Sequence, residues 1–335
     1  MTMSLGLIAF SLSDTSHNVA ANTLTPTDER IWNLSGDGEY IAKSVAVDAW
    51  GNIYVTGYFN QLVGDDYDVF VRKFKSDLTV AWTITWGGDE DDHAEDIAID
   101  ADGNIVVVGG SQSLFPGLTY HVFVARFDTN GNQIDNATRS SNFSEFLWAV
   151  DIGPDGRIYT AGDIHYTGVG LPNHYDALYI IWDWTLTPVV SGTWLNGALI
   201  NNDRAYDIKA TVDSGFVIVG ETESVGAGLY DGFIALYEGV GILIKNQTWG
   251  GSQMESFRGV VIDDPYNIYV AGMTKTGLPA YAAVLLRYNS TLDVQWNTTY
   301  DVSGNDLYYD VCLNSEGYIY TTGYTYNTTT KSDTL

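Results

Sequence analysis

The segment VDAWGNIYVTGY, residues 47–58, is a polar turn followed by an apolar strand that reaches a glycine. The unit returns as IDADGNIVVVGG at 99–110, YNIYVAGMT at 266–274 and GYIYTTGYT at 317–325. Six glycines mark its copies, 52, 53, 58, 52 and 51 residues apart: Gly57, Gly109, Gly162, Gly220, Gly272 and Gly323. A period near 50 residues is typical of one propeller blade. The sequence therefore predicts an all-β chain, a β-propeller of four-stranded antiparallel blades.

Each repeat contains four strand patterns. We letter the four strands of a repeat A to D in chain order. The short alternating strand A leads into an A–B turn, such as Asp102-Gly103, Asp155-Gly156 or Ser214-Gly215, whose residues tolerate positive φ. The strand with the periodic glycine follows, and we expect this glycine to allow a neighbouring blade to approach closely. The third strand spans 68–74, 121–127, 176–182, 231–237 and 282–288. Each copy ends on an aromatic residue that we expect to be buried: Phe74, Phe127, Trp182, Tyr237 and Tyr288.

The two ends of the chain do not fit the repeat in full. SLGLIAFSL at 4–12 resembles the apolar part of a secretory signal without its basic start, so 1–29 is interpreted as a leader and 30–335 as the propeller domain. Trp32 is interpreted as part of an outer strand, and Asp333 as the start of a third strand. We therefore predict five complete blades and one composite blade, from a parent fold of six or seven blades truncated at its C-terminus.

Composition limits the partners and the location. The chain of 335 residues has 42 acidic against 15 basic residues and a net charge of −27, a field that repels nucleic acid. The longest apolar runs are too short to span a bilayer. The single Cys312 excludes an internal disulfide and is expected to be buried. The chain also has seven Asn-x-Ser/Thr sequons, at which an exported protein could be glycosylated. Together these features favour an extracellular or cell-surface protein.

The units D-x-x-GNIYVTGY, D-VFVRKF and W-x-x-TWGG resemble the prokaryotic seven-bladed β-propeller (SBBP) repeat over about residues 30–335. The resemblance implies a propeller fold and a secreted or cell-surface setting. It implies no catalytic residue, and this chain shows about six blades rather than seven.

Few motifs in the chain carry chemistry. GxSxG, HExxH and a phosphate-binding glycine loop are absent from the sequence. His165 and His174 share one loop with Asp163 and Asp176, a set that could hold a divalent metal, although solvated loop histidines are the more common case. No other cofactor is indicated.

Two periodic features fall on the same end of the predicted blades. An acid precedes the first strand of five repeats: Asp92, Glu145, Asp203, Glu255 and Asp306. A tyrosine precedes the third strand: Tyr67, Tyr120, Tyr175, Tyr230 and Tyr281. The acids either ring the channel mouth, where calcium could bind, or cap backbone N–H groups. The tyrosines either pack between blades or form a ligand face.

Three functional interpretations remain. The first is a non-enzymatic surface scaffold that binds a protein or polysaccharide through its loop face. The second is a hydrolase or lyase that uses paired carboxylates at the channel mouth, which requires a concave site. The third is a structural module of a larger surface protein. The sequence favours the first.

Overall fold

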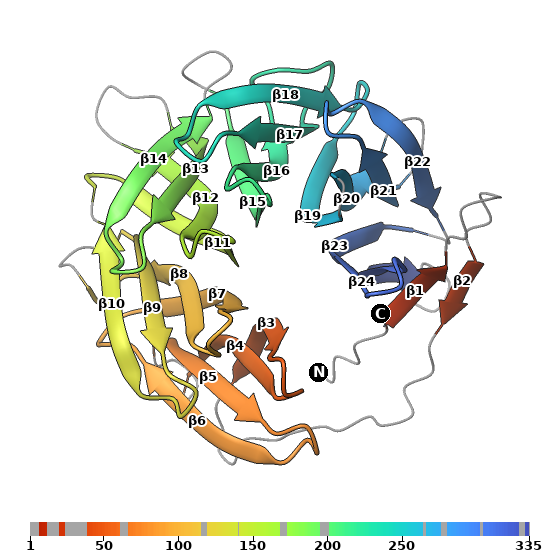
Figure 1. Cartoon of the computed structure of the whole chain (residues 1–335). Helices are drawn as coiled ribbons and strands as arrows, with labels where there is room; N and C mark the ends of the chain where they lie inside the picture. The colour runs from red at the N-terminus through yellow and green to blue at the C-terminus, as the bar shows by residue number, and fades with distance from the viewer. Residues whose placement is uncertain are drawn as a thin grey trace. The chain divides into compact units, whose positions relative to one another are not determined.

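The computed structural model describes residues 7–11, 20–23, 39–60, 66–114, 119–139, 141–167, 173–194, 201–263, 266–275, 280–301, 304–327 and 332–334. In these ranges the chain is all-β, and its strands form the four-stranded antiparallel blades of a β-propeller (Figure 1). The predicted fold class is confirmed. The chain packs as two compact units: unit 1 comprises 1–31, 217–238 and 242–335, and unit 2 comprises 32–216 and 239–241.

Unit 2 contains three complete sheets in which each strand pairs with the next. The first consists of β3 (Tyr40–Val47), β4 (Ile53–Phe59), β5 (Asp68–Phe74) and β6 (Val80–Trp86). The second consists of β7 (Asp92–Ile99), β8 (Ile105–Ser111), β9 (His121–Phe127) and β10 (Gln133–Arg139). The third consists of β11 (Ser144–Ile152), β12 (Ile158–Tyr166), β13 (His174–Trp182) and β14 (Pro188–Trp194).

The remaining strands continue the same order. The fourth sheet consists of β15 (Asp203–Ala210), β16 (Phe216–Thr222), β17 (Asp231–Tyr237) and β18 (Leu243–Trp249). The fifth consists of β19 (Glu255–Asp263), β20 (Asn267–Thr274), β21 (Ala282–Tyr288) and β22 (Val294–Tyr300). The last sheet of unit 1 contains β23 (Asp306–Leu313) and β24 (Ile319–Asn327), together with β1 (Leu7–Ser11), β2 (Ala20–Thr23) and β25 (Ser332–Thr334).

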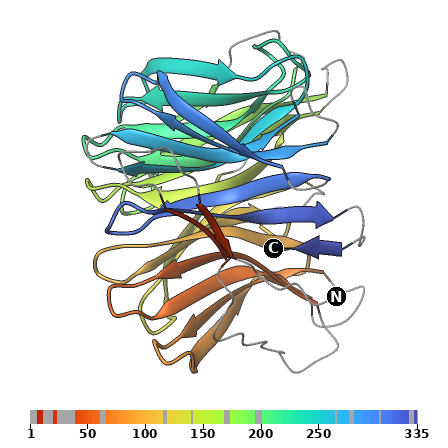
Figure 2. The ribbon, with the colours of Figure 1, turned by 90° about the vertical axis from the view of Figure 1, so that its right-hand side faces the viewer.

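Two strands, β1 and β2, lie within the expected leader. β1 pairs with β24 from Leu7 opposite Thr322 to Phe10 opposite Ile319, and β2 pairs with β1 (Figure 2). β25 pairs with the far end of the same edge of β24, placing Asp333 opposite Tyr326. Asp333 thus lies in the middle of β25, and β1 continues along that edge. Residues of the expected leader therefore occupy the position that the sequence interpretation left empty; Trp32 lies outside the described residues.

The periodic glycines are required by a bulge within their own blade. A β carbon on Gly109 would collide with the carbonyl oxygen of His93 on β7, the strand paired with β8. The register shifts at this point, between Ala94 and Asp96. An added β carbon would collide with a carbonyl oxygen of the first strand of the same blade at four other periodic glycines: Gly57, Gly162, Gly272 and Gly323. The expected close approach is present, but the backbone belongs to the same blade rather than to a neighbouring blade.

The turns follow one geometry at both hairpins of a blade. Gly103 and Gly156 have φ of +84° and +76°, as the Asp-Gly pairs predict. In the turn before β16, however, Ser214 takes the positive φ of 64°, not Gly215. A leucine has the positive φ in three turns between a third and a fourth strand: Leu78, Leu186 and Leu292. The position within the turn therefore determines which residue adopts the left-handed conformation, even where that residue is not glycine.

The cores lie between successive sheets within each unit. In unit 2, Phe127 of β9 packs with Tyr54, Val71 and Val107, and Trp182 of β13 packs with Val124 and Leu178. All five aromatic residues that close a third strand are at most 4% exposed, which confirms the prediction. Burial of each such side chain contributes roughly 1.5–3 kcal/mol. Cys312 is exposed, contrary to expectation, and the register shift in β23 between Tyr308 and Asp310 changes which residues face inward.

No helix among the described residues is long and apolar enough to cross a membrane.

Candidate functional site

Unit 2 gathers six aromatic side chains where the B–C and D–A loops meet the sheets. We call them the aromatic cluster: Tyr58, Tyr67, His93, Tyr120, Phe146 and Trp148. They come from β4, the residue before β5, β7, the residue before β9, and β11. Each of these residues is half-buried. Loops at one end of a rigid sheet commonly carry binding residues.

His93 is the centre of the cluster. Its imidazole stacks on Tyr58 with ring centroids 4.1 Å apart, and both Tyr67 and Tyr120 lie 5.6 Å away. Burial lowers the pKa of His93, while the Asp91 carboxylate opposes this shift. Burial raises the pKa of Tyr120 to about 12, assisted by Asp91 and Asp92. The imidazole is therefore favoured in its neutral form, and it packs as an aromatic ring.

Phe146 and Trp148 extend the cluster along β11. Their rings lie 4.5 Å apart, and Phe146 also contacts Tyr120 at 5.3 Å. Trp148 sits at the bulge of β11, between the paired residues Leu147 and Ala149. Its Nε1–H donates a 2.6 Å hydrogen bond to Asp163 Oδ2. The bulge thus turns the indole onto the loop end of the blade, and Asp163 fixes its orientation.

Charged side chains border the aromatic cluster on two sides. Lys43 Nζ lies 2.6 Å from Glu95 Oε2 and 5.8 Å from the centroid of the Tyr58 ring. Burial raises the pKa of Glu95, although Lys43 counteracts part of this shift. On the other side, Arg204 lies 4.0 Å above the Tyr175 ring and 4.0 Å from Asp163. The aromatic cluster therefore combines aromatic rings with neighbouring donors and acceptors of hydrogen bonds.

The five predicted tyrosines are all half-buried, and their main chains link successive blades. The carbonyl oxygen of Tyr67 accepts a hydrogen bond from the N–H of Asp92, at 2.6 Å. Tyr120 and Glu145, Tyr230 and Glu255, and Tyr281 and Asp306 repeat this contact. Tyr67 N–H donates in return to Asp91 Oδ1. The two periodic features of the sequence are thus parts of one junction that holds neighbouring blades.

The predicted acids do not lie on an exposed rim. Asp92, Glu145 and Glu255 are 0% exposed, and Asp203 and Asp306 are 1% exposed. Asp92 Oδ2 accepts hydrogen bonds from Gly88 N–H and the Ser113 hydroxyl, and Glu255 Oε2 accepts one from Gly251 N–H. At these two junctions the geometry is that of backbone capping.

Three of these acids face an aspartate on a third strand. Burial, with Asp203 adding to it, raises the pKa of Asp176 to about 6, against an opposing effect of His174. Burial and the nearby Asp92 raise the pKa of Asp68, and burial with Glu255 raises that of Asp231. Within the described residues no three His, Cys, Asp or Glu side chains form a metal-binding group. Calcium binding at these acids stays a prediction.

His165 and His174 are engaged separately. His165 stacks on Tyr175 with centroids 4.0 Å apart, and its Nε2 contacts Asn173. His174 stacks on Tyr166 and lies 3.8 Å from Asp176. They belong to no metal-binding group of the described residues, and each imidazole stacks on a tyrosine. The metal interpretation stays a prediction.

Sequence reasoning identified Tyr67, Tyr120 and Tyr175 but missed Tyr58, His93, Phe146 and Trp148. A usable signal was present for Tyr58, which directly follows a periodic glycine. No pattern marked Trp148, because the bulge that turns it outward depends on pairing with β12.

Comparisons with known proteins bear on the fold. No family model matches the chain, and no curated protein matches it. Among solved structures, a protein of unknown function from Dyadobacter fermentans aligns at 12% identity with a TM-score of 0.50, over 84% of this chain and 94% of that chain. A gluconolactonase from Xanthomonas campestris aligns at 12% identity, TM-score 0.43, over 84% and 85%. The Pan2 WD40 domain of Neurospora crassa aligns at 8% identity, TM-score 0.44, over 84% and 88%.

At such identities the likeness concerns the fold alone. The resemblance to the SBBP repeat stays a prediction.

Proposed function

We propose that this protein is a non-enzymatic extracellular scaffold that binds polysaccharide through the aromatic cluster. The observation that carries the proposal is the continuous run of half-buried rings from Tyr58 to Trp148, bordered by the Lys43–Glu95 and Arg204–Asp163 pairs. Sugar rings present apolar C–H faces to aromatic side chains, while their hydroxyl groups exchange hydrogen bonds with charged neighbours.

A polysaccharide fits this surface better than a protein partner does. A stable protein interface needs an apolar centre depleted of charge, with about 800 Å² buried on each side. Here ion pairs adjoin the rings directly, and Glu95, at 8% exposed, lies beneath the surface rather than at a polar rim. A glycan alternates apolar faces with hydroxyl groups, and this alternation matches a surface on which aromatic rings adjoin ion pairs.

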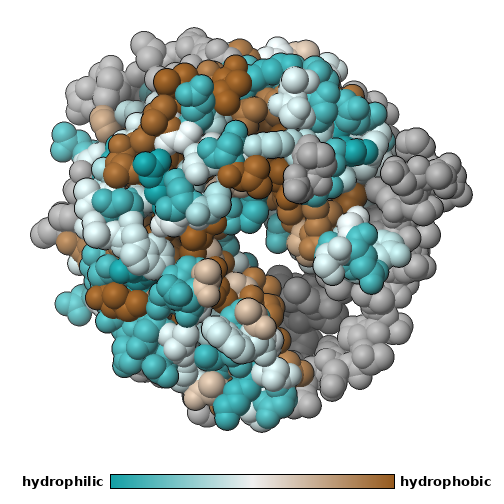
Figure 3. All heavy atoms as spheres, in the orientation of Figure 1, coloured by the Kyte–Doolittle hydropathy of each residue, from teal (hydrophilic) through white to brown (hydrophobic). Residues whose placement is uncertain are grey.

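The carboxylate-based hydrolase receives no geometric support. The five periodic acids are at most 1% exposed, so a substrate does not reach them in this conformation. The acidic surface and the sequons support export of the chain. Hydrophilic residues dominate much of the face shown in Figure 3, with smaller apolar groups among them. Detection of the protein outside intact cells would test this part of the proposal.

A glycan array with the purified chain tests the binding function. We expect binding to one group of polysaccharides, and about a tenfold loss of affinity in Trp148→Ala or Tyr58→Ala. Trp50→Ala is the matched control, because Trp50 is 64% exposed and lies in an A–B turn at the other end of the blade. Binding that survives both cluster substitutions, or that is lost in Trp50→Ala, would contradict the proposal. Binding of a protein but of no glycan would favour the protein-binding alternative.

A further inference from the structure

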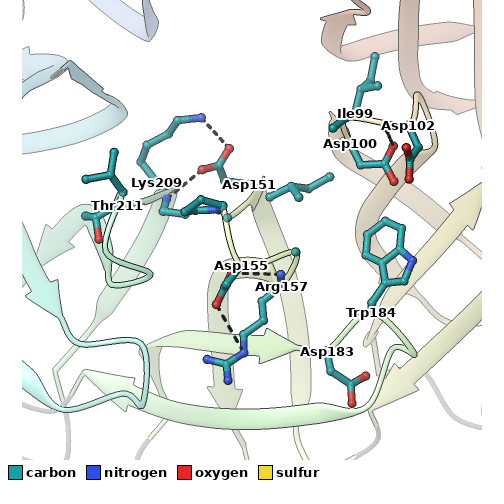
Figure 4. A pocket seen from close by; sticks show the side chains of 17 residues that line it. Ile99, Asp100, Asp102, Asp151, Asp155, Arg157, Asp183, Trp184, Lys209 and Thr211 are labelled. Carbon is teal, nitrogen blue, oxygen red and sulfur yellow. Dashed lines mark hydrogen bonds and ion pairs between the residues drawn. The ribbon is translucent and has the colours of Figure 1, made fainter.

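A second candidate site lies at the opposite end of the unit 2 sheets. The A–B turns after β7, β11 and β15 and the turn after β13 line an open surface cavity of about 780 Å³ (Figure 4). This volume is in the range of small-molecule sites. The cavity is separate from the aromatic cluster, since the A–B turns and the B–C loops lie at opposite ends of each antiparallel sheet.

The cavity lining carries excess negative charge. It contains five aspartates against one lysine and one arginine. Both basic groups already have acidic partners: Lys209 Nζ lies 2.6 Å from Asp151, and Arg157 Nε lies 3.6 Å from Asp155. The remaining aspartates are Asp100, Asp102 and Asp183. Asp100 and Asp183 accept hydrogen bonds from their own turns, whereas the carboxylate of Asp102 has no partner among the described residues.

Trp184 supplies an aromatic wall to the same cavity. In Figure 4 its indole extends from the turn after β13 toward Asp100 and Asp102. The guanidinium carbon of Arg126 lies 4.0 Å from the centroid of this indole, although Arg126 is not part of the lining. The indole thus already contacts one cation, and Trp184 also forms part of the cavity lining. A cavity lined by both an indole and a carboxylate is a favourable environment for an ammonium group.

We propose that this cavity binds an alkylammonium group, carried either by a free polyamine or by a lysine side chain. The ammonium ion lies between the Trp184 indole and the Asp102 carboxylate, and the aliphatic stem packs against Ile99 and Ile152 in the lining. The paired Lys209 and Arg157 leave the site net negative and exclude anionic ligands. Because much of the attraction is electrostatic, affinity falls as salt rises.

Calorimetric titration of the full chain with spermidine tests the proposal. We expect saturable binding, and no binding of a neutral diol of the same chain length. Asp102→Asn and Trp184→Leu each weaken spermidine about fivefold, the loss of one such interaction. Glu316→Gln is the matched control: Glu316 precedes Gly317 in its turn as Asp102 precedes Gly103, but it lies in unit 1. It reports any general attraction of polyamines to a chain of charge −27.

A lysine-containing peptide forms the second arm. Tighter binding of this peptide than of spermidine identifies a protein source of the ammonium group, and the reverse order identifies a free polyamine. Equal binding of the neutral diol would overturn the proposal. So would wild-type affinity in Asp102→Asn, a substitution on an exposed turn that leaves the core intact.

Discussion

Replacing Gly109 by alanine tests why a glycine recurs in every blade. The new methyl group would meet the carbonyl oxygen of His93 at far less than van der Waals distance and the ring of Phe123 at 3.0 Å. β7 and β8 cannot both keep their register and accept this group. Overpacking of a buried site costs about 1–3 kcal/mol, and loss of the β7 bulge adds to it, so we expect Gly109→Ala to destabilise unit 2 by about 3 kcal/mol.

Gly156→Ala provides the comparison that separates collision from backbone strain. Gly156 has φ +76°, but nothing lies within 4 Å of the position of an added β carbon. Its substitution therefore introduces only the cost of a left-handed residue, about 1 kcal/mol. Gly109→Ala should lose about three times as much stability.

Urea unfolding followed by tryptophan fluorescence measures both variants, because Trp82 and Trp86 pack against the core that contains β8 and β9. Hydrogen exchange of the amides of β8 shows whether the loss is local to that sheet. A Gly109→Ala variant within 0.5 kcal/mol of the wild type, or more stable than Gly156→Ala, would refute the bulge explanation.

Three further predictions concern a titrating carboxyl, a turn and a strand. The folded-state pKa of Asp176, raised to about 6, means that stability is highest below the unfolded value near 4 and falls as pH rises through 6. In urea unfolding between pH 4 and 8, Asp176→Asn should remove up to about 3 kcal/mol of the change in unfolding free energy with pH. Identical pH slopes in the variant and the wild type would contradict a raised pKa of Asp176. Ser214→Gly should stabilise by up to about 1 kcal/mol because it relieves a positive φ of 64°, and a thermal melt that drops by several degrees would contradict this. Ala9→Pro should abolish exchange protection of Ile319–Thr322 in β24, whereas protection equal to wild type would show that β1 does not pair there.

The sequence predicted the blades well because they depend on local patterns. The third strands at 68–74, 121–127, 231–237 and 282–288 were expected at the residues where the structure has them. Apolar alternation, Asp-Gly turns and aromatic ends all act within one hairpin. For the same reason the burial of Trp182 followed from its place in the repeat.

Features that depend on pairing between distant segments were missed. The Gly109 contact with β7 was expected from a neighbouring blade, since spacing alone does not reveal a bulge. The segment 7–11 is short and has no turn signal beside it. Its partner β24 lies more than 300 residues further along the chain, so no local sequence pattern indicated that the two strands pair. Only two of the six residues of the aromatic cluster were predicted, because Tyr67 and Tyr120 recur in the repeat whereas Phe146 and Trp148 do not.

The binding function of the aromatic cluster is the central claim, and the indole N–H resonance of Trp148 tests it most directly. The chain has ten tryptophans, and Trp148→Phe assigns the resonance. Its proton is hydrogen-bonded to Asp163, so a glycan at the cluster changes its surroundings. We predict that titration with an oligosaccharide selected on the array shifts this resonance and leaves that of Trp50 unchanged. Saturable binding with no shift at Trp148, or with the shift at Trp50 instead, would contradict the account.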